Sequence, residues 1–142
     1  RMAIDDYYRD PENYVYNPKY FEEIKKVSHR DFTTGFYFGK PTSEAQVYTS
    51  SSYIRGYDFV GMVLDYDKET HIATIEQRNR LFTGEEIEVF GPGKEHFTQK
   101  IEQMWNDEGK EIDVAPHAQM IIKMKMLKDV ERFYLLRKGR ED

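Results

Sequence analysis

Short runs of alternating apolar and polar residues, separated by turn sequences, fill the chain from Tyr53 onward and constrain its fold more than any other feature. The clearest run is QMIIKMKM (119–126), in which apolar side chains at the even positions alternate with Lys123 and Lys125. A period of two is typical of a strand that buries one face. Turn sequences such as GPG and NDEGK separate the runs. The pattern predicts a mostly β fold, a small antiparallel barrel or sandwich of about six or seven short strands.

The predicted β domain covers residues 53–142, with a polar segment before it. We expect its strands within the segments 53–66, 71–80, 87–90, 96–105, 111–115, 119–126 and 132–138. The preceding sequence PTSEAQVYTSSS (41–52) is rich in serine and threonine and is expected to be an exposed loop.

Residues 1–40 form a third predicted segment, a helical linker that ends in an aromatic stretch. A first helix can end at Asp10, because proline follows at position 11. A second helix can begin at Asn17, a favourable N-cap, with Pro18 in the first helical position. The stretch SHRDFTTGFYFGKP (28–41) is too broken by glycine for a helix and too aromatic for an ordinary linker.

Composition narrows the possible classes of function. The chain has 142 residues, 33% of them charged, and a formal net charge of −5. These values predict a soluble, cytoplasmic protein with no membrane partner and argue against a dedicated nucleic-acid binder. The absence of cysteine excludes disulfides, thiol nucleophiles and thiolate metal sites within the chain. The chain begins at Arg1, which suggests a piece of a longer protein.

The sequence contains no recognisable motif for catalysis or cofactor binding. The four histidines (His29, His71, His96 and His117) have no metal-ligand spacing. The chain has no G-x-S-x-G elbow, and GPGK (91–94) lacks the strand–loop–helix context of a phosphate-binding loop. We therefore predict no catalytic, cofactor-binding or metal-binding residues and no cofactor in this chain.

Two family resemblances follow from particular stretches. The strand sequences GMV (61–63), ATI (73–75) and FTGEEIEV (82–89) resemble the small β-barrel found as the second domain of elongation factor Tu. The segment DPENYVYNPKYFEEIKKVSHRDFTTGFYFG (10–39) resembles the linker that follows the catalytic barrel in collagenase-like peptidases of unassigned catalytic type, the peptidase U family. That family also contains prephenate-dependent tRNA uridine hydroxylases.

The second resemblance implies what the chain is and what it lacks. In that family a TIM-type barrel carries the chemistry, followed by this linker and a small β-barrel. The chain lacks the catalytic domain, so the resemblance implies a C-terminal accessory domain without activity of its own. Its implied partners are its own N-terminal catalytic domain and a macromolecular substrate, tRNA or protein.

The aromatic stretch supplies the first group of candidate contact residues, which are His29, Arg30, Phe32, Phe36 and Phe38. The phenylalanines are suited to a docking strap, because burying each ring on a neighbouring domain is worth about 1.5–3 kcal/mol. Rings beside an arginine are also suited to stacking on unpaired RNA bases. A third interpretation is that these rings only cover one end of the small barrel.

Basic side chains near the C-terminus supply the second group of candidate contact residues. Residues 41–119 contain 15 acids and 7 bases, net −8, whereas residues 120–142 contain 7 bases and 4 acids, net +3. Lys123, Lys125, Lys128, Arg132, Arg137, Lys138 and Arg140 can form a basic stripe, which Arg78 and Arg80 can extend. The alternative is that these side chains form the solvated face of a final strand pair.

Three hypotheses from different classes therefore remain. The chain positions a macromolecular substrate, tRNA, for an absent catalytic barrel. Alternatively, it is a structural or protein-docking module, or it binds the protein substrate of a collagenase-like peptidase. Basic side chains that share one face would favour RNA, whereas an apolar groove beside an open strand edge would favour a peptide.

Overall fold

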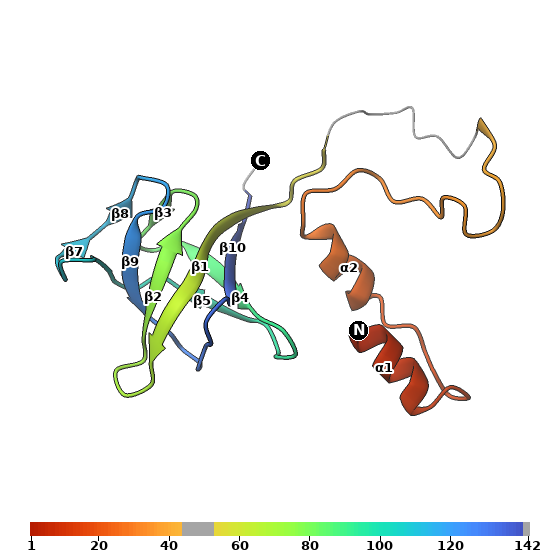
Figure 1. The fold of residues 1–142 in the computed structure, drawn as a ribbon, viewed down its shortest axis with the longest axis horizontal. Coiled ribbons are helices and arrows are strands. Elements are labelled where there is room, and N and C mark those ends of the chain that lie inside the picture. Colours follow the sequence, from red (N-terminus) through yellow and green to blue (C-terminus); the bar gives the residue numbers. More distant parts are fainter. Residues whose placement is uncertain (44–52, 141–142) are drawn as a thin grey trace. The chain divides into compact units, whose positions relative to one another are not determined.

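The computed structural model describes residues 1–43 and 53–140, and the chain divides into two compact units (Figure 1). The first unit is Arg1–Gly56 and the second is Tyr57–Asp142. Most of the predicted exposed loop at 41–52 lies outside the described residues.

Two short helices form the described beginning of the first unit, α1 (Met2–Arg9) and α2 (Lys19–Lys25). Helix α1 ends directly before Asp10, as the following proline predicts. Helix α2 begins after Pro18, and the side-chain Oδ1 of Asn17 accepts a hydrogen bond from the backbone N–H of Lys19 at 3.0 Å. The predicted positions are therefore one residue too early, because Pro18 rather than Asn17 is the N-cap and Lys19 is the first helical residue.

The aromatic stretch after α2 is a succession of turns. The N–H of Tyr37 donates to the carbonyl of Thr34, and the N–H of Gly39 donates to the carbonyl of Phe36. A positive φ of 128° at Gly39 is a conformation that L side chains rarely adopt, which explains the glycine there. None of the described residues of the first unit is buried.

Antiparallel strands form the second unit; within Tyr57–Arg140 there are ten (Figure 1). Their bounds are β1 (Tyr57–Asp67), β2 (Ile72–Gln77), β3 (Leu81–Phe82), β4 (Glu86–Phe90), β5 (Phe97–Lys100), β6 (Met104–Asn106), β7 (Glu111–Ile112), β8 (Val114–Ala115), β9 (Ile121–Lys125) and β10 (Leu135–Gly139). Eight strands form one sheet in the order β5-β4-β10-β1-β2-β9-β6-β7, and β3 pairs with β8. The predicted mostly β, antiparallel fold is confirmed, whereas the likeness to elongation factor Tu stays a prediction.

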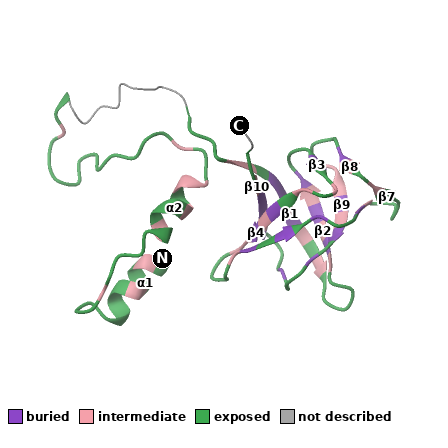
Figure 2. Ribbon diagram, turned by 180° about the vertical axis from the view of Figure 1, so that it is seen from behind, coloured by how far each residue is buried: buried purple, intermediate pink, exposed green. Residues whose placement is uncertain are grey.

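The hydrophobic core lies on the inner face of this sheet, where the alternating residues point. Val63 of β1 pairs with Ile75 of β2, and Ile75 pairs with Ile122 of β9; all three are fully buried. On β9, Ile122 and Met124 are buried while Lys123 and Lys125 are not, as the alternation predicts. Figure 2 shows the buried residues gathered on the strands of this unit. Burying each such side chain contributes about 1.5–3 kcal/mol.

Strand β1 bends at two irregularities, where its register shifts between Phe59 and Gly61 and again between Val63 and Asp65. A Cβ added to Gly61 would lie 2.8 Å from Cγ2 of Ile75, closer than real Cβ atoms approach. Glycine at 61 therefore allows β1 and β2 to pack closely at the first bend, which is the role that barrel glycines are expected to have.

The strand prediction was wrong in four places. About six or seven strands were expected where ten are found within Tyr57–Arg140, and β3 (Leu81–Phe82) lies outside every predicted segment. The segment 96–105 contains two strands, β5 and β6, which lie far apart in the sheet order. The segment 111–115 is divided, because β7 pairs with β6 while β8 pairs with β3. The last two strands, β9 and β10, are not a pair, because β1 and β2 lie between them.

Two buried glutamine side chains connect strands where backbone pairing does not. Gln99 of β5 donates from Nε2 to the carbonyl of Lys125 at 2.9 Å and accepts from the N–H of Leu127 at 3.0 Å. Gln77 of β2 donates from Nε2 to the carbonyl of Ala115 of β8 at 2.6 Å. Each side-chain amide thus hydrogen-bonds the backbone of a segment with which its own strand is not paired. Among the described residues, no helix is long and apolar enough to cross a membrane.

Candidate functional site

The first three residues of the aromatic group lie together within the first unit. His29 forms a backbone bridge with Ile54, and its ring stacks on the ring of Phe32 at 4.8 Å between centroids. The Nδ1 atom of His29 lies 2.8 Å from the carbonyl oxygen of Val27. The guanidinium of Arg30 lies 4.9 Å from the ring centre of Tyr53. His29 and Arg30 are therefore held by neighbours within the first unit.

The other two aromatic candidates are open to solvent. Phe36 is 77% exposed and Phe38 is 82% exposed, whereas Phe32 is 46% exposed. Exposed phenylalanines are unfavourable in water, so rings in this state favour a contact with another molecule or domain. This exposure is compatible with the strap and with base stacking, and the third interpretation, rings that cover one end of the barrel, stays a prediction as well.

The basic candidates of the second unit fall into two groups rather than one stripe. Lys123 and Lys125 lie on the outer face of β9, and Lys125 is paired with Ile72 at the beginning of β2. Arg78 and Arg80 follow the end of β2, at the opposite end of that strand. We call these two sets the β9 group (Lys123, Lys125 and Lys128) and the β10 group (Arg78, Arg80, Arg137, Lys138 and Arg140). Only Arg132 remains outside both groups.

Ion pairs neutralise much of the β10 group. Nε of Arg78 lies 2.8 Å from Glu76. Nζ of Lys138 lies 2.7 Å from Glu85 and also donates to the carbonyl of Arg80 at 3.0 Å. A lysine that already neutralises a carboxylate attracts phosphate less, so this group is the weaker candidate for RNA.

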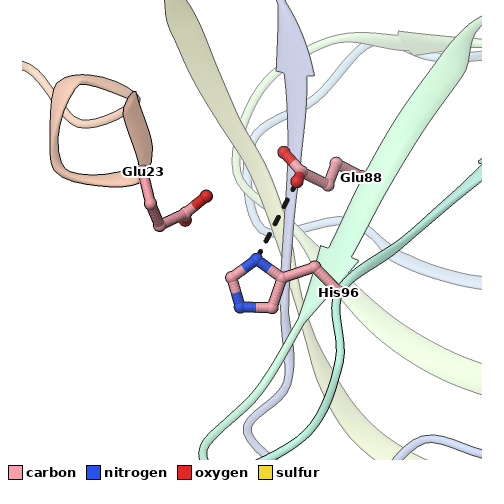
Figure 3. A group of neighbouring side chains, drawn as sticks. All are labelled: Glu23, Glu88 and His96. Carbon is pink, nitrogen blue, oxygen red and sulfur yellow. Dashed lines mark ion pairs between the residues drawn. The ribbon is translucent and has the colours of Figure 1, made fainter. Parts of the chain in front are cut away.

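Arg137 is the most strongly engaged of these cations and is only 4% exposed. Its Nε donates to Glu88 at 2.7 Å, and its guanidinium lies 4.3 Å from the ring centre of Phe90 and 5.2 Å from that of Tyr57. The same carboxylate lies 3.8 Å from Nδ1 of His96, as Figure 3 shows. Because this guanidinium is buried and already engaged by a carboxylate and two rings, Arg137 is unsuited to contact a phosphate.

A polar recess of about 960 Å³ lies beside the β10 group. Its lining includes Asp58, Thr83, Glu85, Glu86, Lys138 and Arg140. The lining mixes both signs of charge without a cluster of one kind. The recess therefore does not resemble an anion site or a site for an apolar ligand.

The loop between β9 and β10 contains a surface feature that the sequence analysis missed. Arg132 was a candidate, and the structure places its guanidinium 4.7 Å from the ring centre of Phe133. Phe133 is 57% exposed and has a positive φ of 72°. The sequence RFYLLRK predicts a strand throughout, and the signal that could have distinguished Phe133 was the arginine–aromatic pair itself.

A second missed feature joins a tyrosine, a histidine and an aspartate. The hydroxyl of Tyr66 donates to Oδ1 of Asp129 at 2.8 Å and lies 2.9 Å from Nδ1 of His71. Burial, the Asp129 hydrogen bond and the charges of Asp129 and Asp67 together raise the pKa of Tyr66 to about 12. Asp129 is far from Tyr66 in the sequence, so no local motif could reveal this cluster.

Comparison with known proteins places the chain in a family. The Peptidase family U32 C-terminal domain matches residues 55–137. The tRNA hydroxylation protein P1 of Bacillus subtilis (strain 168) is 41% identical over 140 residues, which is 99% of this chain and 33% of that protein. The chain thus spans about a third of the length of this curated relative.

Two solved structures have a similar fold. Both are C-terminal domains of a Geobacillus thermoleovorans protein described as a U32 peptidase. The selenomethionine variant is 46% identical, with a TM-score of 0.56, and covers 57% of this chain and 99% of that one. The other structure is 42% identical, with the same TM-score of 0.56, and covers 59% of this chain and 93% of that one. The chain belongs to the U32 peptidase family and contains its C-terminal domain, which confirms the family predicted from residues 10–39.

Proposed function

We propose that this chain is a non-catalytic, cytoplasmic accessory domain that positions tRNA for the catalytic barrel of its parent protein. The observation that carries the proposal is its 41% identity to the tRNA hydroxylation protein P1 along 99% of its length. In this proposal the chemistry belongs to the absent TIM-type barrel. The chain itself supplies contacts and holds no cofactor.

The charge distribution supports the proposal and suggests where the phosphates bind. The chain is acidic as a whole, but residues 120–142 are net +3. Within them, Lys123 and Lys125 alternate outward from buried residues of β9, so both ammonium groups face away from the core. A few such contacts on an acidic body give weak, salt-sensitive binding, which suits a domain that assists a neighbouring barrel.

Binding of total tRNA to the 142-residue chain at several salt concentrations tests this proposal. We expect weak binding whose affinity falls as salt rises. The double variant Lys123→Glu, Lys125→Glu should weaken it and lower the slope of log affinity against log salt by about 1–2. The control is Lys94→Glu, Lys110→Glu, which reverses the same number of exposed charges in turns of the same domain. Absence of tRNA binding by the unmodified chain at low salt would contradict the proposal.

The alternative function is protein docking, and the exposure of Phe36 and Phe38 favours it. These rings would bury against the parent's catalytic domain or, in a collagenase-like peptidase, contact a protein substrate. Calorimetric titration of the separate catalytic domain with this chain tests the first case. Phe36→Ser, Phe38→Ser should abolish the heat of binding if the strap docks there, and tRNA affinity should stay unchanged.

A further inference from the structure

The loop between β9 and β10, residues 126–134, exposes the ring of Phe133 while its backbone is anchored to the core and to β1. Val130 and Tyr134 are 2% and 5% exposed and anchor the loop in the core. The N–H of Phe133 donates to the carbonyl of Val63 at 2.8 Å, and the N–H of Val63 donates to the carbonyl of Tyr134 at 2.8 Å. The backbone at Phe133 is thus paired with β1, while its ring is 57% exposed.

The backbone conformation at Phe133 is unusual for its residue type. Its φ of 72° lies in the left-handed region, where glycine and asparagine are favoured and a bulky side chain is disfavoured. Because the ring of Phe133 is largely exposed, packing contributes little energy to offset this disfavoured backbone conformation. Strain of this kind is frequently found at contact sites, where the surrounding structure holds it in place.

A cation lies against the exposed ring. The guanidinium of Arg132 is 4.7 Å from the ring centre of Phe133, within the range of a cation–π contact. Lys128 of the same loop lies over the ring of Phe97 at 5.7 Å, and Lys125 precedes the loop on β9. Asp129 and Glu131 are the acids of the loop, and Asp129 is already hydrogen-bonded to Tyr66. The loop therefore combines an exposed aromatic ring with two cations, Lys128 and Arg132, and a third, Lys125, precedes it.

We propose that Phe133, with Arg132 beside it, is a stacking site for an unpaired RNA base. This inference rests on the proposed function, because it names the part of the RNA that this domain recognises. An aromatic ring offers its face to any base, whereas arginine adds a planar cation for the base or the neighbouring phosphate. The β9 group lies next along the chain and would bind the adjoining phosphates. Recognition is expected to be tolerant of sequence and selective for single strands.

The test measures binding of a short unstructured RNA oligonucleotide and of the same sequence as a blunt duplex. We expect the 142-residue chain to prefer the single strand. Phe133→Asn should weaken single-strand binding roughly 5- to 150-fold, because one stacked base contributes about that factor. The control is Phe82→Asn, which removes a ring of similar exposure (42%) from β3 and should leave RNA binding unchanged.

Stability separates a contact role from a structural one. Asparagine tolerates positive φ, so Phe133→Asn should keep or raise the midpoint of urea unfolding while binding falls. Arg132→Gln should weaken binding and reduce its salt slope by about 0.7, whereas Lys110→Gln, which removes one cation from the β6–β7 turn, should not. A lower unfolding midpoint with unchanged binding for Phe133→Asn would overturn the inference.

A fluorescent variant gives a direct readout that does not depend on loss of function. In Trp105→Phe, Phe133→Trp the only indole occupies the proposed site, and stacking with a base should quench its emission on addition of the single strand. Absence of quenching while RNA still binds would overturn the stacking site and leave the proposed function standing. Absence of any RNA binding by the unmodified chain would overturn both.

Discussion

The two units differ in what they do with aromatic side chains. Residues 1–56 contain 12 aromatic residues and residues 57–142 contain nine, yet every buried residue of the described chain belongs to the second unit. In the first unit, rings meet one another in small contacts, such as Tyr7 with Tyr14 and Tyr37 with Phe38. In the second unit, aliphatic residues and methionines, most of them on paired strands, form the core together with Phe97 and Tyr134.

The difference teaches that abundance of apolar residues does not by itself give a core. A core needs a face on which apolar residues recur, together with a partner face that removes them from water. The strands of the second unit supply both: Val63, Ile75 and Ile122, for example, are paired across β1, β2 and β9. The glycine-rich turns around Phe36 supply neither, so these rings stay exposed and are the part of the chain most suited to an outside partner.

The largest expected effect is a loss of stability, and it tests the contrast between the buried core and the exposed aromatic stretch. Ile75→Ala removes part of a fully buried side chain and should lower the free energy of unfolding by about 2–5 kcal/mol. Phe36→Ala removes a larger group, but one that is 77% exposed, and should change it by about 0.5 kcal/mol or less. Urea unfolding followed by circular dichroism compares the two variants. Equal losses would show that the aromatic stretch packs into a core after all.

An intermediate loss of stability is expected on removal of a buried side chain that hydrogen-bonds the backbone of another strand. Gln99→Ala leaves the carbonyl of Lys125 and the N–H of Leu127 without their partner, which should cost about 1–3 kcal/mol of unfolding free energy. Gln103→Ala is the matched control, because that amide is exposed and its bond to Glu111 lies in solvent. Amide hydrogen exchange at Leu127 should accelerate only in the first variant, and unchanged exchange there would contradict the bridging role of Gln99.

The smallest effect concerns alkaline pH. The pKa of Tyr66 is raised from 10.0 to about 12 by burial and by Asp129, so the folded state favours the neutral phenol. This stabilisation is fully present below pH 10 and is lost as the pH rises toward 12. Tyr66→Phe cannot ionise, so its unfolding midpoint should fall less steeply between pH 10 and 12 than that of the unmodified chain. Parallel pH profiles of the two proteins would contradict this assignment.

Sequence patterns predicted where the strands lie better than they predicted which strands are adjacent in the sheet. Alternation along 119–126 fixed both the strand and its buried face, because a period of two leaves one choice of face. The order of strands in the sheet depends on contacts between distant residues, and no local pattern records them. The chain between Lys100 and Met104 crosses from one part of the sheet to another, but it contains no proline, glycine or turn sequence that would signal the break.

The candidate site was predictable to the same limited extent. Basic residues near the C-terminus were identified, but Glu88 of β4, which pairs with Arg137, and Glu85 just before β4, which pairs with Lys138, are distant in the sequence and could not be assigned from it. Phe133 was missed because a left-handed backbone at a bulky residue contradicts local propensity. Contacts from outside the segment, here the two hydrogen bonds with Val63, hold it there.

The position of β10 has a consequence for synthesis. This strand, Leu135–Gly139, lies between β4 and β1, so the sheet is divided until it arrives. On the ribosome, β1 through β9 emerge first and must wait for their central neighbour, with β1 and β4 each exposing an unpaired edge. We therefore expect nascent chains that end before Leu135 to bind chaperones and to be cut by proteases, and chains extended past Gly139 to resist both.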